Sequence, residues 1–124
     1  MKKLKILTKD PFRIPRQREI NPSGVAEQFH KIVGGYFELL PVQELTEKGI
    51  DLFGNEDARR LNLEPNLYCD DWGYDAMCFG TVIAASHDKE GETISLTDEQ
   101  MEIAREWFNN HSILTRPVTQ VFEL

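Results

Sequence analysis

The chain has 124 residues, of which 40% are hydrophobic and 28% are charged, and its net charge is −7. These values predict one soluble globular domain over residues 1–124, and they exclude a membrane span because no apolar run approaches the ~18 residues that a span needs. The basic start of the chain lacks the apolar core of a secretory signal, and two cysteines are too few for a disulfide framework. We therefore expect a cytoplasmic protein with reduced thiols.

The charges are distributed unevenly along the chain. Residues 1–18 hold seven of the 14 basic groups and one acid, Asp10, whereas the other 106 residues hold seven basic groups and 20 acids. This asymmetry predicts a basic strand and loop arm over 1–18 that lies over an acidic body, where each reduces the self-repulsion of the other. Two functional alternatives stay open: the arm binds phosphate, or the acidic body mimics a nucleic acid.

The first part of the chain predicts a strand, a helix and a hairpin. Residues 4–8 alternate between apolar and polar types, which indicates a strand, and a loop with Pro15 and several arginines follows. Residues 21–35 predict a helix that starts at a proline-containing cap, keeps four apolar residues on one face and ends at a glycine pair. Strands over 36–42 and 50–53 are then expected to pair as a hairpin with a loop of several residues.

The middle of the chain predicts a polar turn, a loop and two more strands. A turn beginning at Asn55 is expected to cap a short helical turn over 57–61. Residues 68–79 show no clear pattern and are expected to form a loop. The near-continuous apolar run over 81–85 is typical of a central strand, and a short strand over 93–96 is expected to pair back.

The last part predicts a capped helix and a final strand. Thr97 and Gln100 stand at the spacing of a capping box, and the helix that follows is expected to fray near Asn109. Residues 117–124 alternate and predict a last strand that ties the C-terminus into the sheet. The sum is an α+β domain with one mostly antiparallel sheet of five to six strands and two main helices.

A polar stretch after the predicted hairpin is the best candidate for a binding site. Two arginines and two asparagines fall within 12 residues there, and guanidinium groups suit phosphate while asparagine amides can contact a base edge. A nearby tyrosine offers a stacking surface, and backbone amides further along can complete a pocket. The candidate ligand-binding residues are Asn55, Arg59, Arg60, Asn66, Tyr68, Gly80 and Thr81. The structural alternative stays open, in which Asn55 caps the short helix while both arginines pair with local acids.

Other site chemistries fit the sequence less well. Cys69 and Cys78 are too far apart in sequence for a usual zinc pair, and the aspartates between them lack the order of a calcium loop. No serine stands in a nucleophile elbow, although Glu38 and Glu56 could form a carboxylate pair for acid–base work. We therefore expect no metal, no cofactor and no catalytic residue. An apolar side left uncovered would be closed by a second copy, so a homodimer is expected.

Four segments carry a resemblance to a known kind of protein: VGGYFELLP, GNEDARRLNLEPN, GTVIAAS and SLTDEQ. In these segments the chain resembles an uncharacterised family of short phage and mobile-element proteins, a domain of unknown function, over residues 20 to 108. The resemblance implies a phage-encoded accessory protein in the cytoplasm of a host bacterium. It implies no activity, because the family has none to carry over.

Three functional hypotheses follow. The first is a non-enzymatic, anti-defence binding protein that sequesters a nucleotide-type immune signal, with Asn66 and Tyr68 contacting the base. The second is a protein–protein inhibitor of a host defence or nucleic-acid enzyme, acting through the acidic surface. The third is a small nucleotide-processing enzyme built around Glu38 and Glu56. The partner is thus a small nucleotide-type ligand or a host defence protein.

Overall fold

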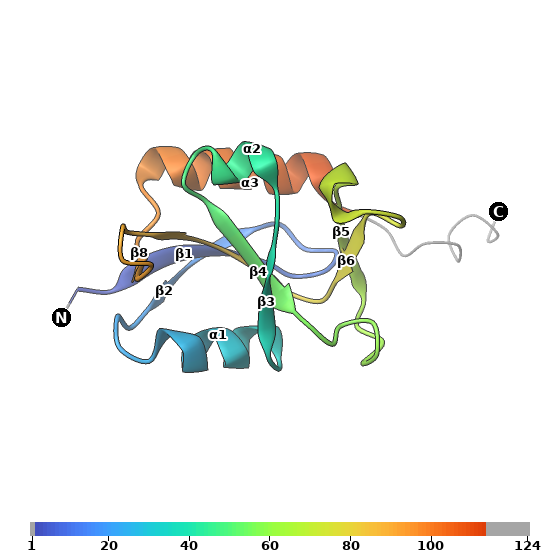
Figure 1. The fold of residues 1–124 in the computed structure, drawn as a ribbon, viewed down its shortest axis with the longest axis horizontal. Helices are drawn as coiled ribbons and strands as arrows, with labels where there is room; N and C mark the ends of the chain where they lie inside the picture. Colours follow the sequence, from blue (N-terminus) through green and yellow to red (C-terminus); the bar gives the residue numbers. More distant parts are fainter. Residues whose placement is uncertain (1, 114–124) are drawn as a thin grey trace.

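The computed structural model of the chain describes residues 2–113, so the strand predicted over 117–124 lies outside the described residues. The strands of the main sheet are β1 (Leu4–Lys9), β2 (Arg16–Ile20), β3 (Phe37–Leu40), β4 (Asp51–Asn55), β7 (Val82–His87) and β8 (Thr93–Ile94). They follow the order β2-β1-β7-β4-β3, with β8 paired to β7, and every pairing is antiparallel. The predicted mostly antiparallel sheet and α+β class are confirmed (Figure 1).

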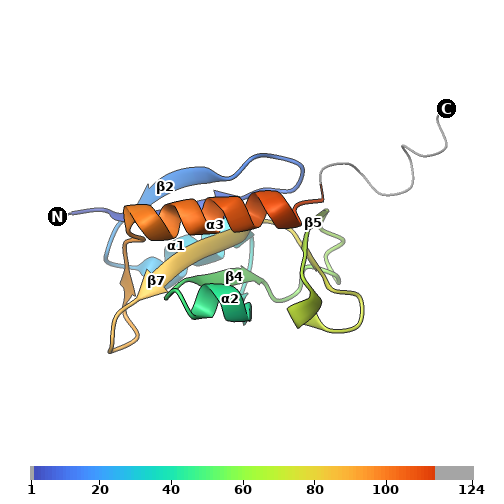
Figure 2. The same ribbon diagram turned by 90° about the horizontal axis from the view of Figure 1, so that it is seen from above.

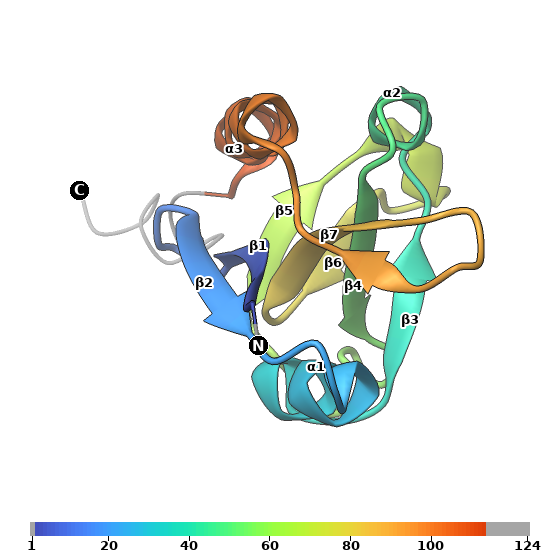
Figure 3. The same ribbon diagram turned by 90° about the vertical axis from the view of Figure 1, so that its left-hand side faces the viewer.

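Helices cover both faces of this sheet. The long helix α3 (Asp98–His111) and the short α2 (Gln43–Thr46) lie over one face, and α1 (Val25–Val33) lies over the other (Figure 3). Each face has its own apolar core, because alternate strand residues point to opposite sides. Leu7 and Ala84 pack in the core with Trp107 and Phe108 of α3. The second core lies under α1 and contains Ile6, Ile20, Phe29, Val33, Ile83 and Ala85.

A second, two-stranded sheet stands at one end of the molecule. Its strands β5 (Pro65–Tyr68) and β6 (Met77–Phe79) pair antiparallel and enclose the short 3-10 helix η1 (Asp70–Trp72). Figure 2 shows β5 beyond the C-terminal end of α3. The prediction of a loop over 68–79 is therefore wrong at β6 and at the end of β5. Acidic residues and Gly73 interrupt the apolar pattern between these short strands, so neither strand produces a periodic signal of its own.

The basic N-terminal segment is part of the main sheet. Strand β1 lies between β2 and β7, and its Ile6 and Leu7 are fully buried. The expected loop after β1 is wrong over Arg16–Ile20, which forms the edge strand β2. Four polar or charged residues precede the single apolar residue Ile20 there, so alternation is hidden. Charged side chains of this kind are common on edge strands because they discourage further pairing.

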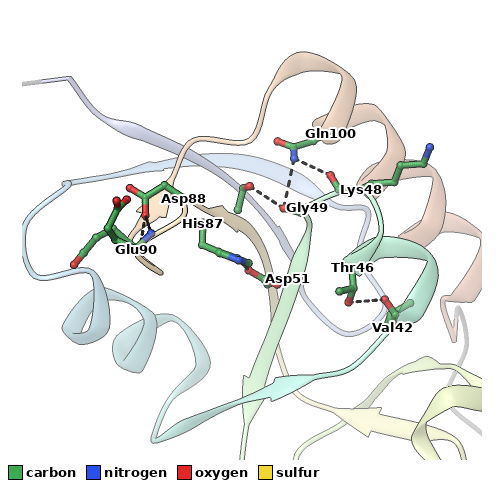
Figure 4. A network of polar contacts seen from close by, with 11 residues as sticks. Val42, Thr46, Lys48, Gly49, Asp51, His87, Asp88, Glu90 and Gln100 are labelled. Carbon is green, nitrogen blue, oxygen red and sulfur yellow. Dashed lines mark hydrogen bonds and ion pairs between the residues drawn. The ribbon is translucent and has the colours of Figure 1, made fainter.

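Polar contacts join the start of α3 to the connection between α2 and β4 (Figure 4). The predicted capping box is confirmed, because Thr97 Oγ1 accepts from the Gln100 backbone amide at 3.0 Å and Gln100 Oε1 accepts from the Thr97 amide at 2.9 Å. The Gln100 side-chain amide also donates to the Lys48 carbonyl at 2.9 Å. Ser86 Oγ donates to the Gly49 carbonyl at 2.7 Å, and His87 Nδ1 lies 2.5 Å from Asp51 Oδ2. No helix in the described part of the chain is long and apolar enough to cross a membrane.

Candidate functional site

A pocket of about 290 Å³ opens where the main sheet meets the two-stranded sheet. Strands β3 and β4 form one wall, the turn after β4 forms the second, and β6 forms the third. The lining residues are Glu38, Leu40, Gly54, Asn55, Glu56, Asp57, Ala58, Arg59, Arg60, Met77, Cys78 and Phe79. The lining thus combines an apolar wall with two guanidinium groups and three carboxylates. Three of the seven predicted site residues are among them.

Arg59 contacts both β6 and the loop before it. Its Nη2 atom lies 2.6 Å from Asp75 Oδ2 and donates to the Met77 carbonyl at 3.4 Å. The centre of the guanidinium lies 4.5 Å from the centre of the Phe79 ring, which is a cation–π distance. The turn that carries Arg59 is fixed by backbone hydrogen bonds, including one from the Leu61 amide to the Asp57 carbonyl at 2.9 Å. These contacts hold the Arg59 guanidinium against the β6 wall.

Arg60 lines the same pocket, and its side chain is less constrained than that of Arg59. Its Nη2 atom lies 3.2 Å from Asp57 Oδ2, and its side chain is 72% exposed. Each of the two arginines thus pairs with a nearby acid, as the structural alternative to ligand binding expected. Glu38 and Glu56, the carboxylates considered for acid–base work, both line this pocket as well. The pocket therefore presents carboxylate hydrogen-bond acceptors beside the two guanidinium groups.

Asn55 forms part of the pocket wall, but its side-chain amide is already used. Its Oδ1 accepts from the Asp57 amide at 2.7 Å, and its Nδ2 donates to the Val33 carbonyl at 3.1 Å. A Cβ atom on Gly35 would lie only 2.9 Å from Asn55 Nδ2, so glycine permits this close packing. Asn55 thus caps the turn and ties it to the end of α1, which fixes the two arginines in position.

The other four predicted site residues do not line the pocket. Asn66 is fully buried, and its Nδ2 donates to the Gly80 carbonyl at 2.7 Å and to the Lys9 carbonyl at 2.8 Å. Thr81 donates to Asp10 Oδ1 at 2.7 Å. The Tyr68 hydroxyl donates to the Asn110 carbonyl at 3.4 Å, on the side of α3. These contacts give Asn66 and Thr81 internal partners and place Tyr68 away from the arginines.

A buried thiol and a buried ammonium lie at the β6 wall. Burial raises the pKa of the Cys78 thiol to about 12, so the thiol stays protonated near neutral pH. Burial also lowers the pKa of Lys9, although the nearby Asp10 carboxylate opposes that shift. Cys69 is buried too, and burial raises its pKa. Both cysteines are free, and neither environment activates a thiolate nucleophile.

Sequence reasoning did not identify the apolar wall or the acid that pairs with Arg59. Met77 and Phe79 stand in the segment that was expected to be a loop, and Asp75 precedes them. The alternating pair Met77 and Phe79 was the available signal for a short strand, but three residues are too few to establish a period.

A second concave region, the acidic cleft, lies between α2, η1 and α3. Two adjoining hollows of about 340 and 330 Å³ share Glu44, Glu47 and His111. Trp107 Nε1 donates to Glu44 Oε1 at 2.7 Å, and the His111 ring stacks on Trp107 with centroids 4.0 Å apart. The carboxylates that line the acidic cleft are Glu44, Glu47, Asp70, Asp71 and Glu106. Over the described residues, no group of three or more His, Cys, Asp or Glu side chains is placed to hold a metal ion.

Comparison with known proteins identifies one family. Residues 1–109 match the family model described as "Domain of unknown function (DUF3846)". No curated protein matches the chain, and no solved structure matches it. The match covers all of the main sheet, all three walls of the pocket and most of α3.

Proposed function

The chain belongs to the DUF3846 family of domains of unknown function, and we propose that it is a non-enzymatic binding protein that holds a small nucleotide-type ligand beside Arg59. The observation that carries the proposal is the convergence of two guanidinium groups on a pocket with an apolar wall. The pocket volume of about 290 Å³ is close to the lower end of the range for ligand sites. In its cellular role, the protein is a phage accessory factor that sequesters a nucleotide-type immune signal.

Each part of a nucleotide has a matching surface in this pocket. Arg59 and Arg60 supply charged donors for phosphate oxygens, as guanidinium groups do at other phosphate sites. Leu40, Met77 and Phe79 offer an apolar surface for a ring. Sugar hydroxyls or base amino groups would donate to the carboxylates of Glu38, Glu56 and Asp57. This arrangement assigns the base contact to the β6 wall rather than to Asn66 and Tyr68, which do not line the pocket.

The chemistry of the lining favours holding a ligand over transforming it. Cys78, the thiol among the lining residues, is kept protonated by burial. The guanidinium groups remain charged over the accessible pH range and therefore act as electrostatic partners rather than proton carriers. Binding without turnover is what a sequestering protein needs.

The first test is mass spectrometry of small molecules released by denaturing the purified protein, followed by calorimetric titration of whatever is found. A stoichiometric, intact nucleotide supports the proposal, and a processed product contradicts it. The double variant Arg59→Ala/Arg60→Ala should then weaken binding at least ~100-fold, since each charge-assisted hydrogen bond contributes about 1.5–3 kcal/mol. The matched control is Arg16→Ala/Arg18→Ala, which removes the same charge from β2 and should bind normally. Retained affinity in the pocket variant would refute the site.

A second candidate function is protein–protein inhibition through the acidic cleft. The five carboxylates of the acidic cleft lie together on one side of the molecule, as a surface that competes for a basic partner requires. Glu44→Lys/Glu47→Lys should abolish capture of a host defence or nucleic-acid enzyme while leaving nucleotide binding intact. Salt should weaken that capture, because exposed charge contacts are screened. Capture that persists in high salt would argue against mimicry of a nucleic acid.

We further propose that the protein is a homodimer. Leu39 of β3 is 56% exposed, and Tyr36, just before β3, is 69% exposed. Among the described residues, β3 is an edge strand that pairs with β4. A second copy would cover these side chains and pair the open edge. Light scattering should give twice the chain mass, and Leu39→Lys should give the monomer. A monomeric wild-type protein would refute the dimer.

A further inference from the structure

The ion pair with Asp75 uses a guanidinium nitrogen of Arg59, a residue that lines the pocket. Asp75 Oδ2 lies 2.6 Å from Arg59 Nη2, and a carboxylate oxygen at this distance makes the contact that a phosphate oxygen would make. Both side chains are about half exposed, at 54% and 48%. A ligand phosphate that reaches the same guanidinium therefore meets a competitor supplied by the chain itself.

The segment that carries Asp75 is a short connection between two anchored points, η1 before it and β6 after it, where the Ala76 carbonyl accepts from the Cys69 amide at 2.7 Å. The Gln43 amide donates to Asp71 Oδ2 at 2.9 Å, and Trp72 Nε1 donates to the Pro41 carbonyl at 2.9 Å, so η1 is fixed against the α2 connection. Beyond it, Gly73 has a φ of 87° and open space around its Cβ position. Within the described residues, the side-chain interaction recorded for Asp75 is the one with Arg59.

We propose that Asp75 is a built-in competitor that occupies the Arg59 guanidinium when no ligand is bound, and that an oxyanion ligand frees the guanidinium by displacing this carboxylate. The inference rests on the proposed function, because it assigns regulation to the same site. The segment Gly73–Asp75 acts as the latch, and Gly73 supplies the freedom to turn. Phe79 stays under the guanidinium in both states and keeps Arg59 in place for the exchange.

The strength of the ion pair suits this role. Exposed ion pairs contribute little to stability, so their removal corresponds to at most about a fivefold change in an equilibrium constant. A phosphate that engages both Arg59 and Arg60 can outcompete one exposed carboxylate. The latch therefore lowers the affinity for weak anions by a few fold without blocking a ligand that also fills the apolar wall.

The test compares Asp75→Asn with wild type and with Glu56→Gln, which removes the same charge from the pocket lining without a direct contact to Arg59. Inorganic phosphate and AMP serve as probes in NMR titrations that follow the Arg59 Nε–H signal. Asp75→Asn should bind both probes about threefold to fivefold more tightly than wild type and more tightly than Glu56→Gln. Backbone amide hydrogen exchange at Gly73–Ala76 should be faster in ligand-free Asp75→Asn than in ligand-free wild type. AMP should raise this exchange rate in wild type and leave it unchanged in Asp75→Asn.

The outcomes separate the latch from the site. If AMP and phosphate leave the Arg59 signal of both wild type and Asp75→Asn unchanged, the proposed function fails and the latch fails with it. A second outcome is that wild type binds the probes and Arg59→Ala does not. If the affinity of Asp75→Asn then rises no more than that of Glu56→Gln, the latch alone is refuted. Unchanged exchange at Gly73–Ala76 in free Asp75→Asn also refutes it, independently of any ligand.

Discussion

Lys9 and Asn66 form a reciprocal pair at the junction of the two sheets. Lys9 Nζ donates to Asn66 Oδ1 at 2.9 Å, and Asn66 Nδ2 donates back to the Lys9 carbonyl at 2.8 Å. Lys9 Nζ also donates to the Asp10 carbonyl at 2.8 Å, so the recorded acceptors of this buried ammonium are neutral oxygens. Asn66 donates further to the Gly80 carbonyl, which links β1, β5 and the start of β7. One amide thus fixes the position of β6 and with it the pocket wall.

Replacing Asn66 with alanine should destabilise the protein by about 3 kcal/mol, because two carbonyls and the Lys9 ammonium each lose a buried partner. Urea unfolding measures the effect. The control is Asn109→Ala on the exposed side of α3, which should change stability by less than about 0.5 kcal/mol. An Asn66→Ala variant as stable as the control would mean that the pair does not hold the sheets together.

Cys78 should make stability fall at alkaline pH. The folded thiol keeps its proton up to a pKa of about 12, whereas the unfolded thiol loses it near its ordinary value of 9.0, so deprotonation favours the unfolded chain between these values. The stabilisation is complete below pH 9 and is lost as the pH rises toward 12. From pH 8 to 10 under reducing conditions, wild type should lose about 1.3 kcal/mol more than Cys78→Ala. Equal losses in the two proteins would show that the thiol is not buried as described.

Periodic patterns in the sequence predicted the elements that pack against a core. The apolar run over 81–85 and the apolar face of α1 both appear where they were expected, because burial on one or two sides imposes a visible period. Strand β2 and strand β6 were missed for the opposite reason. One lies at an edge with charged side chains, and the other has only three residues.

The candidate site was predicted in part for a related reason. Arg59 and Arg60 were found because charged residues close together in sequence stay close in space. Phe79 and Asp75 come from a separate strand and loop, and their contacts with Arg59 depend on the pairing of β5 with β6. The residue types of a segment do not predict burial, because Asn66 belongs to a polar stretch and yet is fully buried.

The capping box should contribute measurably to α3. Thr97→Ala removes the acceptor for the Gln100 amide and should lower stability by about 1 kcal/mol, whereas Thr97→Ser keeps the hydroxyl and should stay close to wild type. Thermal unfolding followed by circular dichroism distinguishes the two variants. A Thr97→Ser protein as unstable as Thr97→Ala would indicate that the methyl group, and not the cap, supplies the stability.

The carboxylates of the pocket allow binding and catalysis to be separated. Glu38 and Glu56 line the pocket beside both arginines, so their negative charges oppose an anionic ligand. If the protein only binds, Glu38→Gln and Glu56→Gln should keep the affinity for the nucleotide within about fivefold of wild type, since one exposed charge contributes at most about 1 kcal/mol. If it is an enzyme that uses them as acid and base, wild type should convert the nucleotide, and each variant should lose turnover while still binding. Chromatography of the nucleotide after prolonged incubation with wild type decides between these cases, because an unchanged nucleotide leaves the two glutamates no catalytic step to perform.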